Sequence, residues 1–404
     1  MHHYTVPDTL TKLTQMGDVT LFEPAGDQPL QEKKSPHPLT PSPQSREGGR
    51  MSREHFQSSG LLDCISHVST PQGSKPIMKA MMTTACERNC YYCPFRAGRS
   101  KTHRVSFTPD EMAGAFDILQ REKRVDGLFL SSGIIKGSIT TQDKILDTVE
   151  IIRRKKGYRG YIHLKIMPGI EYDQLYQAMR LADRISVNLE GPTEERLERL
   201  APKKEFMREL LTMIQWAEQI RRDHPDEYLA RTVTQFVVGA VGDTDLELLS
   251  LTEKLHRHSG LTRAYYSPFS PISQTPLENV DPTPTIREHR LYQSSFLLRD
   301  YGWNVEELSF LVDGNLRMDM DPKRAWAEEN LRQAPIELNT ASREELMRVP
   351  GIGPKTVDVL LRERQNSTLT QIHELRKLGM RAPESAAPFI LLNGRRPSEQ
   401  MSLW

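Results

Sequence analysis

Cysteine is scarce in this chain of 404 residues, which contains only four. It has no apolar run of about 20 residues that could span a membrane, and its start lacks the basic and apolar regions of a secretory signal. Its 54 basic and 53 acidic residues nearly balance, which excludes a global polycation that coats nucleic acid but not a local basic face. Three of the four cysteines crowd into eight positions, which suits a metal or redox site in a reducing compartment better than a disulfide framework. We therefore expect a cytoplasmic protein.

The length predicts two or three domains. Residues 1–60 form a short N-terminal element and a Pro/Ser-rich insertion, and Gln31–Arg53 within it is expected to be disordered because it has too few apolar residues to bury. Residues 61–320 alternate short apolar strands with amphipathic helices. Residues 321–404 are expected to be purely helical and to form a separate small domain.

Six β-α units in succession predict an α/β fold with a parallel sheet, either open or curled into a partial barrel. Ligands of such sheets gather at the carboxyl ends of the strands. The predicted strands are Ile77–Thr84, Gly127–Ser131, Tyr161–Ile166, Arg184–Leu189, Thr232–Val238 and Arg263–Ser267. The predicted helices are Pro109–Arg124, Lys144–Lys155, Tyr172–Ala182, Lys204–Arg222, Asp245–His258 and Ile286–Tyr301.

Cys86, Cys90 and Cys93 follow the first predicted strand with the spacing C-x3-C-x2-C. Three thiolates on such a loop can each hold one iron of a [4Fe–4S] cluster, which leaves the fourth iron open as a reaction site. Ordinary buried thiols, or structural zinc completed by His103 or Cys64, are the alternatives. Closed zinc sites usually bring a second ligand pair, and none is present, so the spacing favours the cluster. Cys64 is expected to be a structural thiol.

The same loop, with Tyr92 before the last cysteine, resembles the C-x3-C-x-aromatic-C signature of the radical S-adenosylmethionine (SAM) superfamily. The resemblance covers about residues 61–320 and implies a partial (β/α)6 radical SAM barrel. It also implies that SAM chelates the open iron and that one electron, from a donor such as flavodoxin or ferredoxin, cleaves it to a 5′-deoxyadenosyl radical. The protein's task is then to position the cofactor and exclude water.

The resemblance assigns further residues near the strand ends to SAM. Ser131-Ser132-Gly133 stands where the family often has Gly-Gly-Glu, so the acidic residue is absent here. Glu190 could contact the ribose or could be a surface carboxylate beside a turn glycine. His163 and Lys165 could line the barrel or lie on its outer face. The full set of expected cofactor-binding residues is Tyr92, Ser131, Ser132, Gly133, Asn188, Glu190, Gln235 and Gly239.

Near the carboxyl end, the run Val349–Thr356 resembles the helix-hairpin-helix family of DNA binders that read no sequence. Glycines allow a tight turn whose N–H groups face an anion at the start of the next helix, where a DNA phosphate would sit beside a lysine. The alternative is a hairpin used for packing or for a protein partner. The expected DNA-binding residues are Gly351, Ile352, Gly353, Lys355 and Thr356.

Both regions together resemble a family of bacterial radical SAM proteins for DNA modification or repair, which are associated with a uracil-DNA-glycosylase-like partner. The resemblance implies an enzyme that acts on DNA. Two alternatives stay open: an enzyme whose substrate is RNA or a protein bound to nucleic acid, and an iron–sulfur DNA-binding sensor that no longer cleaves SAM. Production of 5′-deoxyadenosine separates the sensor from the enzymes.

Overall fold

The computed structural model describes residues 9–16, 64–70, 73–100 and 102–397. The insertion predicted to be disordered lies outside these residues. The chain divides into two compact units: the first comprises the chain up to Phe236 and Ser259–Asp281, and the second comprises Val237–His258 and the chain from Pro282. These units interleave along the chain, whereas the predicted domains 61–320 and 321–404 follow it in order, and those ranges stay a prediction. Within the described part of the chain, no helix combines the length and the apolar character needed to cross a membrane.

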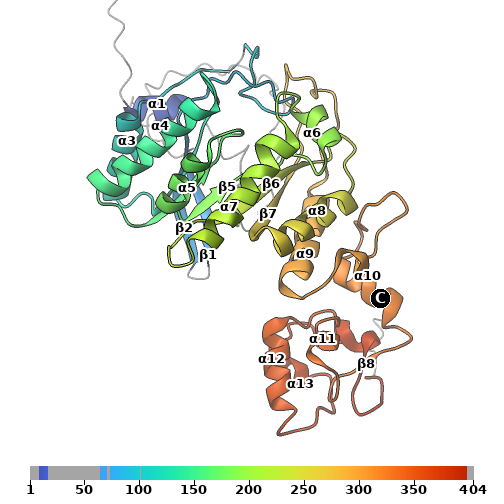
Figure 1. Cartoon of the computed structure of the whole chain (residues 1–404). Helices are drawn as coiled ribbons and strands as arrows, with labels where there is room; N and C mark the ends of the chain where they lie inside the picture. The colour runs from blue at the N-terminus through green and yellow to red at the C-terminus, as the bar shows by residue number, and fades with distance from the viewer. Residues whose placement is uncertain (1–8, 17–63, 71–72, 101, 398–404) are drawn as a thin grey trace, which may run out of the picture. The chain divides into compact units, whose positions relative to one another are not determined.

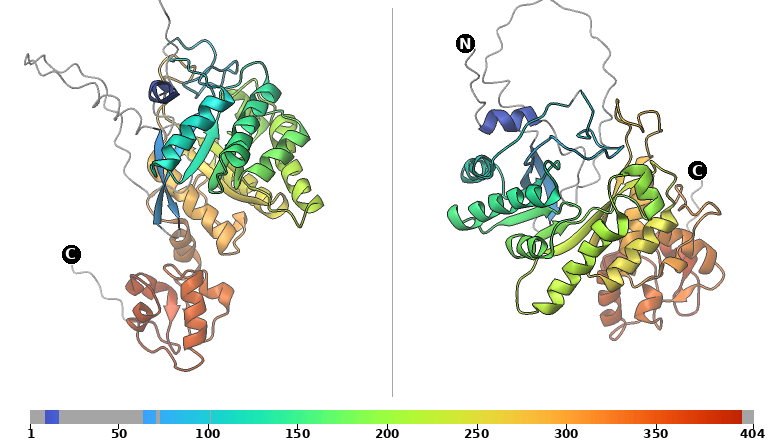
Figure 2. Two further views of the ribbon diagram at one scale, coloured as in Figure 1. Left: turned by 90° about the vertical axis from the view of Figure 1, so that its left-hand side faces the viewer. Right: turned by 45° about the horizontal axis from the view of Figure 1, so that its top comes forward.

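A seven-stranded sheet with the strand order β1 to β7 forms the centre of the first unit. The α/β prediction is confirmed, because β2 to β6 pair in parallel and the sheet curls into part of a barrel (Figures 1 and 2). The strands are β1 (Ile65–Thr70), β2 (Gly73–Met81), β3 (Gly127–Ser131), β4 (Tyr161–Lys165), β5 (Arg184–Ser186), β6 (Arg231–Val238) and β7 (Leu261–Pro268). The antiparallel hairpin of β1 with β2 was not predicted.

One face of the sheet is apolar, since Leu128, Leu130 and Leu164 are fully buried at alternate positions of β3 and β4. Figure 1 shows helices along the outside of the sheet, which accounts for this burial. The helices of this unit are α1 (Thr9–Met16), α3 (Pro109–Arg121), α4 (Ser138–Glu150), a π-helix (Ile151–Lys155), α5 (Tyr172–Leu181), α6 (Glu194–Leu200), a π-helix (Phe206–Leu211) and α7 (Thr212–Asp223). The opposite face carries the polar residues at the strand ends.

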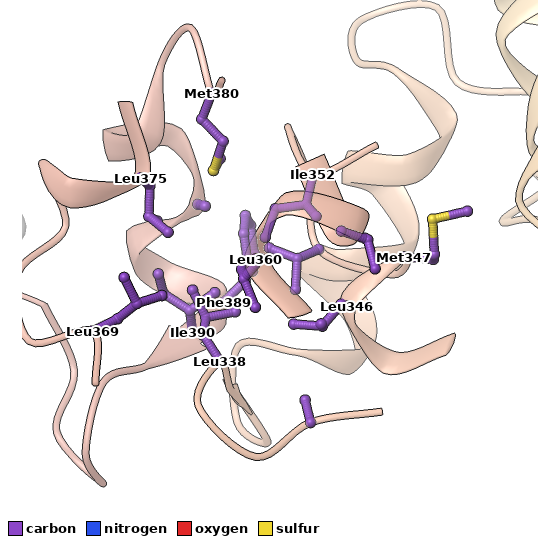
Figure 3. Close-up of a cluster of buried hydrophobic side chains, with 14 of the residues drawn as sticks. Leu338, Leu346, Met347, Ile352, Leu360, Leu369, Leu375, Met380, Phe389 and Ile390 are labelled. Atoms are coloured by element: carbon purple, nitrogen blue, oxygen red, sulfur yellow. The ribbon is translucent and has the colours of Figure 1, made fainter. Parts of the chain in front are cut away.

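The second unit is helical and has its own apolar core. Its elements are α8 (Asp245–His258), α9 (Thr285–Asp300), a 3-10 helix (Val305–Glu307), α10 (Pro322–Asn330), β8 (Ile336–Glu337), α11 (Arg343–Leu346), α12 (Pro354–Glu363), α13 (Glu374–Lys377), a 3-10 helix (Pro383–Phe389) and β9 (Ile390–Leu391). Leu346, Ile352, Leu360 and Phe389 meet in the core (Figure 3). The expectation that residues 321–404 are purely helical needs one correction. The short strands β8 and β9 pair in parallel and connect the chain before the hairpin with the chain after it.

Candidate metal centre and nucleic-acid interface

The cysteine loop leaves β2 at the carboxyl edge of the sheet. Cys86, Cys90 and Cys93 are free thiols, and each of them interacts electrostatically with the other two. The Ile134 N–H donates to the Cys86 sulfur and the Phe95 N–H to the Cys93 sulfur, both at 3.4 Å. Backbone N–H groups aimed at sulfur suit bound thiolates, and such bonds tune the reduction potential of an iron–sulfur cluster.

Burial raises the pKa of both the Cys90 and the Cys93 thiol. These thiols must therefore release protons when iron binds, because thiolate is the ligand form. Throughout the described residues, no group of three or more His, Cys, Asp or Glu could hold a single metal ion. A [4Fe–4S] cluster does not need such a group, because each thiolate binds a different iron. Cys64 lies apart from the loop: it precedes β1, is fully buried, and its carbonyl accepts the Lys79 N–H at 2.7 Å.

The segment after β3 packs directly against the cysteine loop. The Gly133 N–H donates to the Thr83 carbonyl at 2.7 Å, and a Cβ at Gly133 would lie 2.2 Å from the Ala85 carbonyl oxygen, so only glycine fits. The Glu87 carboxylate accepts the N–H groups of Lys136 and Gly137 at 3.2 and 3.1 Å, next to the start of α4. The loop is thereby fixed to the β3–α4 connection on one side.

Glu190, which lies beyond the end of β5 and forms an isolated bridge with Phe236 of β6, is not the surface carboxylate of the alternative prediction. Its side chain is 1% exposed and pairs with the Lys204 ammonium at 2.9 Å, and it also interacts with the Tyr92 hydroxyl. Burial disfavours both charges, but the Lys204 ammonium lowers the pKa of Glu190, and the Glu190 carboxylate raises the pKa of Lys204. The pair is therefore ionised at neutral pH.

The other expected SAM residues lie along the polar face or near it. The buried side chains of Asn188 and Gln235 share a hydrogen bond of 3.3 Å. Ser131 is buried at the end of β3, and the Ser132 hydroxyl donates to the Gly133 carbonyl at 2.6 Å. Their contact with SAM stays a prediction.

Gly239 falls in the second unit. Its φ is +89°, its N–H donates to both Asp243 carboxylate oxygens at 3.0 Å, and a Cβ there would lie 2.1 Å from the Thr283 hydroxyl oxygen. Glycine is therefore required at this position for backbone and packing reasons. Its predicted place along the adenine of SAM is a separate prediction.

His163 and Lys165 share a face of β4, as residues two apart must. The His163 ring is buried and meets Phe129 edge to face, with 4.7 Å between ring centroids. Lys165 interacts electrostatically with Cys90 and Glu190, so this is the face that lines the barrel.

The segment Leu200–Glu209, between α6 and α7, is part of the site and was not predicted to be. It binds the cysteine loop through both backbone and side chains, as the Tyr91 N–H donates to the Leu200 carbonyl at 2.7 Å. Lys203 and Lys204 follow a proline in a polar run, a pattern that normally indicates a solvated turn. No local sequence signal distinguishes Lys204, because its role depends on a carboxylate 14 residues away.

The hairpin turn of the second unit has the geometry that its glycines predict. Gly351 has a φ of +81°, and Gly353 is the N-cap of α12 with no side chain to cap it. Lys355 is exposed, whereas the Ile352 and Thr356 side chains are buried, so these two can offer only their backbones to a ligand. The helix before the turn, α11, begins at a capping box of Ser342 with Glu345.

A buried lysine holds this turn from α10. The Lys323 ammonium donates to the Ile352 carbonyl at 2.5 Å and lies 4.7 Å from the Tyr301 ring centroid. Burial lowers the pKa of Lys323 to about 7. The Tyr301 hydroxyl also lies close to Gly353, where a Cβ would be 3.1 Å from its oxygen.

Comparison with known proteins gives two family matches. Residues 81–255 match the Radical SAM superfamily, and residues 336–362 match the Helix-hairpin-helix motif. No curated protein matches the chain.

Several solved structures are similar to part of the chain. The crystal structure of HydG, a maturase of the [FeFe]-hydrogenase, is 14% identical, with a TM-score of 0.45 over 55% of this chain and 49% of that one. Methylornithine synthase (PylB) is 17% identical, with a TM-score of 0.44 over 55% and 61%. A radical SAM methyltransferase from Sphaerobacter thermophilus is 14% identical, with a TM-score of 0.43 over 57% and 66%. This chain thus spans about half to two thirds of the length of these structures.

The two family matches fall on the two regions whose geometry is described above. The first covers the cysteine loop and the strands β3 to β6, and the second covers the Gly351–Gly353 turn and most of α12. Residues 81–255 are therefore a radical SAM domain, the kind of domain that uses a [4Fe–4S] cluster and SAM, and residues 336–362 form a carboxyl-terminal helix-hairpin-helix motif.

Proposed function

We propose that this protein is a radical SAM enzyme that acts on DNA, in a modification or repair reaction, and that its hairpin holds the DNA backbone. The observation that carries the proposal is the turn from Gly351 to Gly353, which opens directly into α12. The first N–H groups of a helix have no partner within the helix and bind anions. Pro354 at the first helical position has no N–H, so the Lys355 and Thr356 N–H groups are the donors that a phosphate would meet.

The proposed DNA contact is not sequence-specific. Phosphate oxygens are the same at every nucleotide, and backbone donors at a turn reach no base edge. Lys355, exposed next to the donors, adds a charge that displaces a counterion from DNA. We expect binding to duplexes of unrelated sequence with similar affinity.

The chemistry belongs to the first unit. When bound, the cluster and SAM supply one-electron cleavage of SAM and abstraction of hydrogen from the substrate. We propose that Ser131, Ser132, Gly133 and the hydrogen-bonded pair of Asn188 and Gln235 contact SAM, because they lie near the carboxyl edge of the sheet from which the cysteine loop leaves. A flavodoxin or ferredoxin would supply the electron, and a uracil-DNA-glycosylase-like protein is a proposed partner.

The decisive experiment measures 5′-deoxyadenosine from reduced, anaerobically reconstituted protein with duplex DNA, single-stranded DNA, RNA or no nucleic acid. We expect DNA to increase production above the level without nucleic acid. A larger increase with RNA would move the substrate class to RNA. A cluster-loaded protein that never cleaves SAM would be a sensor and would overturn the proposal.

Fluorescence anisotropy with Gly353→Val tests the hairpin contact. The valine side chain would block part of the space through which a phosphate reaches the backbone N–H groups. The Tyr301 hydroxyl, which an added Cβ would contact, can move aside. We expect weaker DNA binding with unchanged iron content. Gly114→Ala is the matched control, because Gly114 lies in α3 with nothing within 4 Å of an added Cβ. If Gly353→Val binds as tightly as the parent protein, the hairpin serves packing only.

A further inference from the structure

The backbone at Glu190 adopts a conformation that its side chain disfavours. Its φ is +65°, in the left-handed region, where a Cβ comes too close to the following carbonyl oxygen. Glycine would adopt this conformation without that close contact, and glycine is indeed the next residue along the chain. Strain that persists beside a functional site indicates that the side chain is needed there. We infer that position 190 is occupied by glutamate because the site requires its carboxylate.

The Glu190 carboxylate connects two parts of the site. One partner is the Lys204 ammonium, at 2.9 Å, whose side chain is 9% exposed. The other is the hydroxyl of Tyr92, which is the residue directly before Cys93. A carboxylate buried in this way needs a compensating charge, because an unpaired one would cost several kcal/mol. Lys204 supplies that charge.

Other bonds from the Leu200–Glu209 segment hold the same loop. The Arg88 guanidinium donates to the Lys203 carbonyl and pairs with the Glu209 carboxylate at 3.0 Å. The Lys203 ammonium donates to the Glu87 carbonyl at 3.4 Å. The loop is therefore held across its length by one segment, and Lys204 is the buried cation of that segment.

Lys204 also acts on the thiols themselves. The Lys204 ammonium favours the thiolate form of Cys90, whereas the Glu190 carboxylate opposes it. A cluster on three thiolates is anionic and becomes more so when it is reduced. Charge and hydrogen bonding around such a cluster set its reduction potential.

We propose that Lys204 is a positioning residue for the cluster: paired with Glu190, it fixes the Tyr92 hydroxyl beside the cysteine loop and supplies a buried positive charge that favours the reduced cluster. This role concerns the cofactor and does not depend on which nucleic acid is the substrate.

The test is a redox titration, followed by electron paramagnetic resonance, of full-length reconstituted protein without SAM. Lys204→Met should lower the potential, with a change of about tenfold in the reduction equilibrium, which is 59 mV for one electron. Glu190→Gln should raise the potential, and the double variant should lie between the two. Lys144→Met is the control: it removes an exposed lysine charge from the middle of α4, where solvent screens it, and should leave the potential unchanged.

Two further variants separate charge from packing. Tyr92→Phe removes the hydroxyl and keeps both charges, so it should move the potential less than either charge variant. If Lys204→Met fails to bind iron, the double variant with Glu190→Gln should regain it, because no unpaired charge is then buried. The proposal is overturned if the double variant fails to regain iron. It is equally overturned if the two single variants shift the potential in the same direction, or if neither shifts it at parental iron content.

Discussion

In each unit, a buried lysine lies beside the loop of the candidate site, and these two lysines are held in opposite ways. Lys204 faces a carboxylate, which raises its pKa, and it stays charged at neutral pH. Lys323 donates to a carbonyl and faces an aromatic ring, and burial lowers its pKa to about 7. The difference shows that a buried lysine can either keep a permanent charge beside the cluster ligands or hold a backbone turn while it is only partly charged at neutral pH.

The loops that these lysines support also differ in what lies beneath them. The cysteine loop is held mainly by hydrogen bonds and ion pairs, because its thiols must stay available to iron. The hairpin turn lies on an apolar core, in which Ile352 is 1% exposed and Leu360 fully buried. We therefore expect the first loop to respond to changes of ligand and charge, and the second to respond to changes of packing and pH.

The largest effect should come from the cluster ligands. Alanine at Cys86, Cys90 or Cys93 should abolish iron binding and SAM cleavage, whereas Cys64→Ala should preserve both. DNA affinity should stay at the parental value in all four variants, because the hairpin lies in the other unit. Iron analysis and anisotropy measure the two outcomes on one sample. Loss of the cluster from Cys64→Ala would show that the site has four ligands.

A second effect, of a few kcal/mol, should appear in the pH dependence of stability. Lys323 binds its proton less tightly in the folded protein than in the unfolded chain, where the lysine pKa is about 10.4. The unfolded chain therefore holds more protons between about pH 7 and pH 10, so folding stability should rise with pH across that window and be lowest below it.

The rings of Trp303 and Trp326 in the second unit, with 5.3 Å between their centroids, give a local fluorescence signal for unfolding. Melting temperatures of the parent protein and Lys323→Met, compared from pH 6 to pH 9.5, measure the contribution of Lys323. Methionine has no proton to lose, so the variant should lack this part of the rise. An equal rise of the melting temperature in both proteins would mean that Lys323 is not responsible for the pH dependence.

The smallest effect should be that of Lys355→Ala on DNA binding. The exposed ammonium would neutralise one phosphate. Its loss should therefore reduce the magnitude of the slope of log affinity against log salt concentration by about 1. Anisotropy at several salt concentrations measures the slope. An unchanged slope would place the DNA on another surface.

The sequence predicts the periodic elements well and the local irregularities poorly. Gly127–Ser131 and Asp245–His258 have the predicted bounds because each has a clear apolar pattern with polar residues at its ends. Ile65–Thr70 was missed because Ser, His and Thr alternate with few apolar residues in a short run. The π-helix at Ile151–Lys155 was predicted as ordinary helix, since its sequence continues the helical pattern.

In the same way, the candidate site could be predicted where the chemistry is local. The cysteine spacing and the Gly-Ile-Gly turn lie within a few residues, so the sequence shows them directly. The Glu190–Lys204 pair and the contact of Lys323 with Ile352 join residues that are 14 and 29 positions apart. Such pairs depend on how the chain returns in three dimensions, and residue type alone does not reveal them.

The pairing of β8 with β9 has a consequence for the order of folding during synthesis. Ile336 pairs with Ile390, 54 positions later, and Phe389 beside it fills the core under the hairpin. The ribosome therefore releases all seven strands of the barrel sheet before the hairpin core can close. Because domains generally fold as units and the N-terminal ones fold first, the cysteine loop can take shape and receive iron while the hairpin turn is still incomplete.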